Sequence, residues 1–323
     1  MRLIVSGLPG DTGATMPEKA ASFGRRAGRL CDAISREPRG HGGVTLGVLT
    51  APAAPHSDAG LLFRRADRFL PFSSEAIIAV ATIALERQLI VPAQQGRLQF
   101  DTEAGPVSVT YDIEEVGTRP SRVREVRLVH PDAYVLAAGV DITVRARPVK
   151  VDIAFGGEWL AIADAESAGV RLTRLSNASL RETGALIADA VEKWAGKLLA
   201  ERHESPPDAF SLRGVVVTGP AAEGEPSLRA AVVRRDGTVE HWPSGTALVA
   251  VLSVLTEMGL TGTGDGMELE GLVGTRLRGR IVRQRRVADQ QAIAVEVMGS
   301  SWIIAEHDFV LHGDDPLRDG IAG

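Results

Sequence analysis

The sequence predicts a mixed α/β protein built from two similar halves, and three observations support this fold class. Two segments, residues 75–86 and 245–255, are apolar on nearly every face, as expected of helices buried inside a domain. A hydroxyl residue suited to N-capping opens each helix, Ser73 or Ser74 in the first and Ser244 in the second. Strand-like runs surround each helix, and 323 residues are enough for two hydrophobic cores.

The starts of these two helices are candidate anion-binding elements. The first backbone N–H groups of a helix lack intrahelical partners, and the helix dipole places partial positive charge there. Two such starts facing one cleft could hold a carboxylate and leave a hydroxyl on each side of it. A serine N-cap alone is only a stabilising feature, so the functional hypothesis depends on the pairing of the two starts.

The first half is expected over residues 1–118. A strand at the N-terminus leads into a helix over residues 15–33, because Thr15 is a suitable N-cap and Pro17 fits the first turn. Hydrophobic runs predict further strands at residues 44–49, 60–63, 98–100 and 107–113.

The second half is expected over residues 119–305, after a crossing at the proline-containing turn 117–121. A helix with one apolar face is predicted over residues 185–202. Residues 306–323 are expected to return to the first half. Strands are predicted at residues 126–129, 133–138, 141–144, 149–154, 160–162, 214–218, 228–233, 272–282 and 292–298.

A glycine pair, Gly156 and Gly157, interrupts the strand pattern after Phe155. Glycine pairs in strands often mark a bulge or a close approach of another backbone. A plain hairpin turn explains the same spacing equally well, so both interpretations stay open.

Composition argues against several classes of function. The net charge of −5 does not indicate a nucleic-acid-binding protein. The single cysteine, Cys31, cannot form an internal disulfide and suits a reducing compartment. No signal peptide or membrane-spanning run is visible, so a cytoplasmic protein without membrane partners is expected. The histidines lack metal-ligand spacing, so no metal is expected.

Several motifs in combination resemble the proline racemase superfamily, with its hydroxyproline epimerases and trans-3-hydroxyproline dehydratases. The most specific are Glu-Pro-Arg-Gly-His at residues 37–41 and Asp-Ile-Ala-Phe-Gly-Gly at residues 152–157. Supporting motifs lie at residues 6–9, 15–19, 101–105, 243–246 and 315–317. The resemblance implies a diaminopimelate-epimerase-like fold: each half is a curved sheet around a central helix, and the substrate binds in the cleft between the halves without a cofactor.

The family motifs that carry catalysis are changed in this sequence. Racemases of the family read Met-Cys-Gly-His-Gly-Thr where residues 72–77 read Phe-Ser-Ser-Glu-Ala-Ile. Ser73 and Ser244 therefore stand where the family has its two catalytic cysteines, Glu75 replaces a histidine, and Glu240 replaces an aspartate. A serine hydroxyl is a much weaker acid than a thiol and needs a neighbouring base before it can accept a Cα proton. The family's opening motif, Asp-x-His-Thr-x-Gly-x-Pro, is absent as well.

Dehydration of a 3-hydroxyproline-type substrate is the first expectation, with Ser73, Glu75 and Ser244 around Cα. It needs one base and one donor for the departing hydroxide, whereas racemisation needs an acid and a base on opposite faces. The resemblance implies that dehydratases of the family keep only one of the two cysteines. It also implies substrate contacts from Ser74, Glu240, His241, Gly245, Thr246, His41 and Phe155.

Other interpretations stay open. The chain could be a racemase or epimerase of proline or hydroxyproline that uses serine–carboxylate relays, or a catalytically silent relative that only binds an imino acid. His41 either shapes the cleft or forms hydrogen bonds within its own glycine-rich loop. An imino acid is the expected ligand, and a homodimer is compatible with the family.

Overall fold

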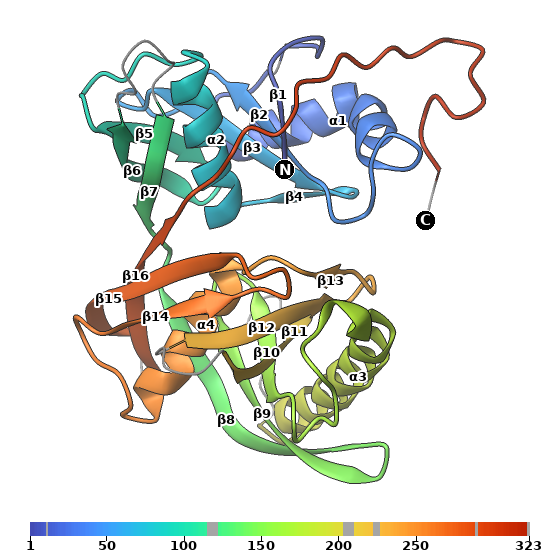
Figure 1. Ribbon diagram of the computed structural model, residues 1–323, viewed down its shortest axis with the longest axis vertical. Coiled ribbons are helices and arrows are strands. Elements are labelled where there is room, and N and C mark those ends of the chain that lie inside the picture. The colour runs from blue at the N-terminus through green and yellow to red at the C-terminus, as the bar shows by residue number, and fades with distance from the viewer. Residues whose placement is uncertain (11, 115–121, 203–209, 222–226, 288–289, 322–323) are drawn as a thin grey trace. The chain divides into compact units, whose positions relative to one another are not determined.

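The structure is a computed structural model that describes residues 1–10, 12–114, 122–202, 210–221, 227–287 and 290–321. The chain falls into two compact units (Figure 1). The first comprises Met1–Val129 with Met298–Gly323, and the second comprises His130–Val297. The crossing predicted at residues 117–121 lies outside the described residues. Strand β7 (Arg122–Val129) pairs with β6 of the first unit, so these residues belong there and not with the second half, where the sequence placed them.

The sheet of the first unit has the strand order β1-β2-β3-β5-β6-β7. The pairs β1–β2 and β3–β5 are parallel, and β2–β3, β5–β6 and β6–β7 are antiparallel. A short strand, β4 (Arg68–Leu70), pairs with β3. The other strands are β1 (Arg2–Ile4), β2 (Thr45–Thr50), β3 (Ala59–Arg65), β5 (Arg97–Thr102) and β6 (Gly105–Glu114).

Helix α1 (Met16–Ser35) begins where its sequence predicts. The Thr15 hydroxyl accepts a hydrogen bond from the Glu18 backbone at 3.3 Å, and the Glu18 carboxylate accepts one from the Thr15 backbone at 3.3 Å. This reciprocal capping box satisfies two donors at the helix start. The helix packs its apolar face, including Phe23 and Cys31, into a core shared with β2 and β3.

Helix α2 (Ser74–Glu86) is the buried helix of the first unit. It packs against β2 and β7 and buries apolar residues over most of its circumference: Ala76, Ile77, Ile78, Val80, Ala81 and Ala84. Complete burial of a single large aliphatic side chain contributes about 1.5–3 kcal/mol. Burial of these side chains therefore stabilises the position of the helix, and with it the position of its N-terminus.

The second unit is a sheet that closes into a barrel. Its strand order is β16-β15-β14-β12-β11-β10-β9-β8, and β8 also pairs with β16. A short strand, β13 (Val239–Glu240), pairs with β12. The remaining strands are β8 (Ala133–Val144), β9 (Arg147–Phe155), β10 (Trp159–Asp164), β11 (Leu212–Pro220), β12 (Ser227–Arg234), β14 (Gly266–Glu270), β15 (Arg276–Val287) and β16 (Gln290–Gly299).

Helix α4 (Gly245–Glu257) is the buried helix of the second unit, and it contacts β8, β9, β10, β14 and β15. Helix α3 (Asn177–Arg202) lies at the outer side of the strands (Figure 1). On β11, Val215 and Val217 belong to the core against α3, while Val216 is equally buried on the opposite face. Because side chains alternate along a strand, a strand covered on both faces reads as a continuous apolar run.

The mixed α/β class is confirmed, whereas several predicted bounds are wrong. Helix α3 begins at Asn177 and not at residue 185, because a 3-10 turn, Arg174–Ser176, leads directly into it. Two predicted strands form the single strand β8, whose register shifts accommodate the left-handed Gly139. Residues 272–275 form a turn with Gly274 at φ +81°, so β15 begins at Arg276.

Within the described part of the chain, no helix is both long and apolar enough to span a membrane.

Candidate active site

The first helix start carries a hydroxyl bonded to a carboxylate. Ser73 is the N-cap of α2, and its hydroxyl oxygen accepts a hydrogen bond from the Ala76 backbone at 3.3 Å. The same hydroxyl donates to Oε2 of Glu75 at 3.2 Å. Glu75 lies in the first helical turn, where the helix dipole favours a negative charge. The pair has the arrangement of a nucleophile or relay beside a base.

Ser74 follows at the first helical position and is fully buried. Its hydroxyl oxygen has no hydrogen-bond partner among the described residues. A buried hydroxyl without a partner costs about 1–3 kcal/mol, unless a ligand or water satisfies it. The backbone N–H groups of the first turn also lack intrahelical partners. This start therefore offers donors that a ligand carboxylate could use.

The turn between β5 and β6 adds a carboxyl group that sequence reasoning missed. The Ala104 backbone donates a hydrogen bond to the carbonyl of Pro71 at 3.2 Å, which ties this turn to the segment before Ser73. The neighbouring Glu103 has one carboxyl oxygen buried without a hydrogen-bond partner in the described structure. Burial raises the pKa of Glu103, because it disfavours the charged carboxylate. The sequence signal that could have identified this carboxyl group is Glu103 itself, an acidic residue in the turn, followed by the small residues Ala104 and Gly105.

The second helix start carries two hydroxyls and has no acidic residue in its first turn. Ser244 is the N-cap of α4, and its hydroxyl oxygen accepts from the Ala247 backbone at 3.5 Å. The same oxygen lies 2.8 Å from the hydroxyl of Thr246. Ser244 is 1% exposed and Thr246 is 7% exposed. The two starts thus have the same capping geometry and different chemical partners.

The glycine pair lies directly against this helix start. A Cβ atom on Gly156 would stand 2.3 Å from the Thr246 carbonyl oxygen, so only glycine fits there. Gly157 has φ +90°, and the Gly156 backbone donates to the Glu158 carbonyl at 3.1 Å within the β9–β10 turn. Both open interpretations hold: the pair forms a hairpin turn, and it allows a close backbone approach.

His130 is a second residue that the sequence did not single out. It is 2% exposed, and its ring borders the position that a Cβ on Gly157 would take, 3.3 Å from Cε1. Its Nδ1 lies 2.9 Å from the Pro131 carbonyl oxygen. Burial lowers the pKa of His130 to about 4, so the imidazole is neutral at pH 7.

The predicted substrate-binding residues Glu240 and His241 both have partners within the second unit. Nε of Arg234 donates to Oε1 of Glu240 at 2.9 Å, and a terminal guanidinium nitrogen donates to Oε2 at 3.3 Å. Nε2 of His241 lies 2.9 Å from Oδ1 of Asn177. Burial opposes the charge of Arg234, yet Glu240 and Glu158 outweigh it and raise the pKa of the guanidinium. A contact of Glu240 or His241 with a substrate nitrogen stays a prediction.

Phe155 packs in an aromatic cluster, and His41 lies in an exposed loop. Phe155 is half-buried and stacks on Tyr134, with ring centroids 5.2 Å apart, and it also packs edge-on against Trp159. His41 is exposed, and its Nδ1 accepts a hydrogen bond from the Gly43 backbone at 3.2 Å. The hydrogen bond within the loop that the sequence allowed for His41 is therefore present. Substrate contacts of both residues stay predictions.

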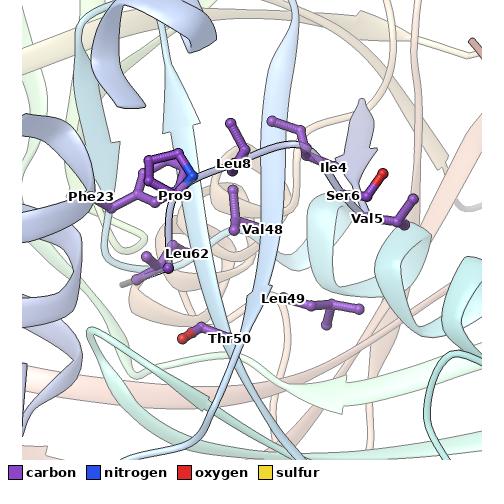
Figure 2. A pocket seen from close by; sticks show the side chains of 11 residues that line it. Ile4, Val5, Ser6, Leu8, Pro9, Phe23, Val48, Leu49, Thr50 and Leu62 are labelled. Carbon is purple, nitrogen blue, oxygen red and sulfur yellow. The ribbon is translucent and has the colours of Figure 1, made fainter. Parts of the chain in front are cut away.

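A cavity of about 140 Å³ lies elsewhere in the first unit, beside the loop that follows β1 (Figure 2). Its lining includes Leu8, Phe23, Val48 and Leu62, together with Ser6 and Thr50. None of the predicted site residues lines it. Within the described residues, no group of three or more histidine, cysteine, aspartate or glutamate side chains could hold a metal ion.

Known structures define the class of fold. A hydroxyproline epimerase from Agrobacterium vitis, solved with trans-4-hydroxy-L-proline, matches with a TM-score of 0.80 and 21% identity, covering 99% of this chain and 91% of that chain. A probable proline racemase from Agrobacterium radiobacter K84, solved with carbonate, also matches with a TM-score of 0.80, at 22% identity, covering 99% of this chain and 92% of that chain. These likenesses show that the chain has the fold of this group of structures.

The sequence pattern of the proline racemase family matches residues 1–322, so the chain belongs to the proline racemase family. The proline racemase of Clostridioides difficile is 28% identical over 320 residues, which cover 99% of this chain and 93% of that protein. A 4-hydroxyproline epimerase of Brucella melitensis is 28% identical over 324 residues, which cover 100% of this chain and 94% of that protein.

Proposed function

We propose that this protein is a cofactor-independent isomerase that removes and returns the Cα proton of proline or a hydroxyproline. The observation that carries the proposal is the hydrogen bond from the Ser73 hydroxyl to the Glu75 carboxylate at the start of α2. Relatives named proline racemase and 4-hydroxyproline epimerase support the substrate class. They also favour isomerisation over dehydration, which was the first expectation from the sequence and its family resemblance.

In this proposal, Ser73 and Glu75 act together as one acid–base group. As the hydroxyl oxygen takes the proton from Cα, its own proton passes to Oε2 of Glu75. The bonds that break are Cα–H and the serine O–H, and the bonds that form are a new serine O–H and a glutamic acid O–H. The electron pair left on Cα delocalises into the substrate carboxylate. Helix N-terminal N–H groups would stabilise that charge as it develops.

Ser244 and Thr246 supply the opposite group. In this proposal the Ser244 O–H bond breaks as the new Cα–H bond forms, and the Thr246 proton moves to the Ser244 oxygen, which lies 2.8 Å away. A proton from solvent water then restores the Thr246 hydroxyl. Return of a proton on that face inverts the stereocentre, and return by Ser73 regenerates the starting isomer. The reaction needs both groups, because racemisation requires an acid and a base on opposite faces.

Dehydration of a 3-hydroxyproline is the second candidate, and the asymmetry of the two helix starts favours it. The Ser73 hydroxyl is bonded to a carboxylate, while the Ser244 hydroxyl is bonded to another hydroxyl. Elimination needs one base at Cα and one donor for the leaving hydroxide, which matches such a pair.

Proton NMR in D2O distinguishes the candidates. The protein would be incubated separately with L-proline, trans-4-hydroxy-L-proline and trans-3-hydroxy-L-proline. We expect loss of the Cα proton signal from one of the first two, with the opposite stereoisomer appearing. Olefinic or imine signals from the 3-hydroxy compound alone would favour the lyase. A protein that exchanges none of the three, in which Ser73→Cys with Ser244→Cys creates exchange, would be a silent binding relative.

A further inference from the structure

We propose that Arg234 is a positioning residue that fixes the start of helix α4 by joining the two segments on either side of it. The expected effect on catalysis rests on the proposed function, whereas the positioning of α4 does not. Arg234 ends β12 and is 8% exposed. Its guanidinium bonds both oxygens of Glu240 and also forms an ion pair with Glu158, whose side chain is 17% exposed.

The first segment runs from Glu240 to Ser244. Glu240 lies on β13, opposite Val232 of β12, and three residues separate it from the N-cap Ser244. The path between them also packs against a neighbouring turn, because a Cβ on Gly271 would stand 2.4 Å from the His241 carbonyl oxygen. A shift of Glu240 would therefore be transmitted over a short, confined path to the Ser244 hydroxyl.

The second segment runs from Glu158 through the glycine pair. Glu158 follows Gly157 directly, and Gly156 approaches the Thr246 carbonyl so closely that a Cβ there would stand 2.3 Å from it. The position of this turn thus limits where the first turn of α4 can lie. The two segments meet at the first turn of α4, where Gly156 contacts Thr246. Arg234 joins their other ends, because it binds both Glu240 and Glu158.

The chemistry of arginine suits this role. A planar guanidinium can bind two carboxylates at fixed angles, whereas lysine offers a single flexible point charge. A buried ion cluster is a weak source of net stability, because the desolvation of its charges offsets their attraction. The effect of the cluster is instead on geometry, because it favours one arrangement of the two segments that it joins.

The test compares Arg234→Lys with the wild-type protein by amide hydrogen exchange and by Cα exchange kinetics. We expect exchange at residues 156–158 and 241–247 to quicken by about tenfold or more, while residues 73–77 of α2 stay unchanged. We expect kcat for Cα exchange to fall by about 10- to 100-fold with a much smaller change in KM, since small misplacements of a catalytic group are costly. Arg235→Lys is the matched control, because that neighbouring arginine pairs with Asp189 and Glu192 of α3.

A second variant guards against misfolding. Arg234→Met combined with Glu158→Gln and Glu240→Gln removes all three charges together, so no unpaired charge is buried, and the same local loss of protection is expected. Unchanged hydrogen exchange in both segments, in a folded variant, overturns the inference. Faster exchange with an unchanged kcat overturns its catalytic part. If the wild-type protein acts on none of the imino acids, the proposed function fails, while hydrogen exchange still decides whether Arg234 positions α4.

Discussion

The Ser73 hydroxyl has two tasks at the residue scale, since it caps α2 and donates to Glu75. Ser73→Ala removes both, and we expect a loss of about 1 kcal/mol in stability from the cap together with a fall of about 100-fold or more in Cα exchange. Urea denaturation and NMR exchange rates measure the two effects separately.

The control for Ser73→Ala is Thr15→Ala, which removes the N-cap of α1. It should cost a similar free energy of unfolding and leave Cα exchange unchanged. If both variants reduced exchange equally, the effect of Ser73→Ala would come from stability and not from chemistry.

Glu103 provides a pH-dependent prediction. Its folded-state pKa is raised by burial, so its stability contribution is largest below the unfolded pKa and is lost as pH rises through the folded value. Glu103→Gln should therefore be more stable than the wild-type protein at neutral pH, with the difference shrinking in acid. Denaturation series from pH 4 to 8 measure this, and a difference independent of pH would contradict it.

At the scale of elements, the approach of the β9–β10 turn to α4 depends on Gly156. Gly156→Ala places a methyl group against the Thr246 carbonyl, and we expect a loss of about 1–3 kcal/mol from overpacking. The matched control is Gly28→Ala in α1, where nothing beyond the neighbouring backbone of the helix itself lies within 4 Å of the new methyl group. That variant should gain about 0.5–1 kcal/mol, because alanine favours a helix over glycine. Equal effects in urea denaturation would refute the close approach.

At the scale of the whole molecule, the buried His130 links stability to acid pH. Its folded-state pKa of about 4 lies below the ordinary 6.5, so the unfolded chain binds more protons between these values. Stability should fall by about 3 kcal/mol between pH 6.5 and 4 from this residue alone. The His130→Gln variant should lose this component, and a wild-type slope in the variant would assign the acid sensitivity to other groups.

Capping explains why sequence reasoning located the helix starts correctly. Thr15, Ser73 and Ser244 each bond to a backbone group three residues ahead, so the signal and the structure lie within one turn. The start of α3 shows the limit of such reasoning: its first residues are polar, and a 3-10 turn without a side-chain cap precedes it.

The sequence by itself determined the mixed α/β class, the two buried helices and the hydroxyls that open them, because periodicity and capping are local. Only the tertiary structure decided what these hydroxyls and carboxylates contact. Arg234 binds Glu240 and Glu158, Gly156 approaches Thr246, and β8 pairs with β16 across contacts between residues far apart in the chain. Such contacts depend on how all the strands pack together. The glycine pair indicated a close approach at residues 156–157, but no local pattern in the sequence names the partner in any of these contacts.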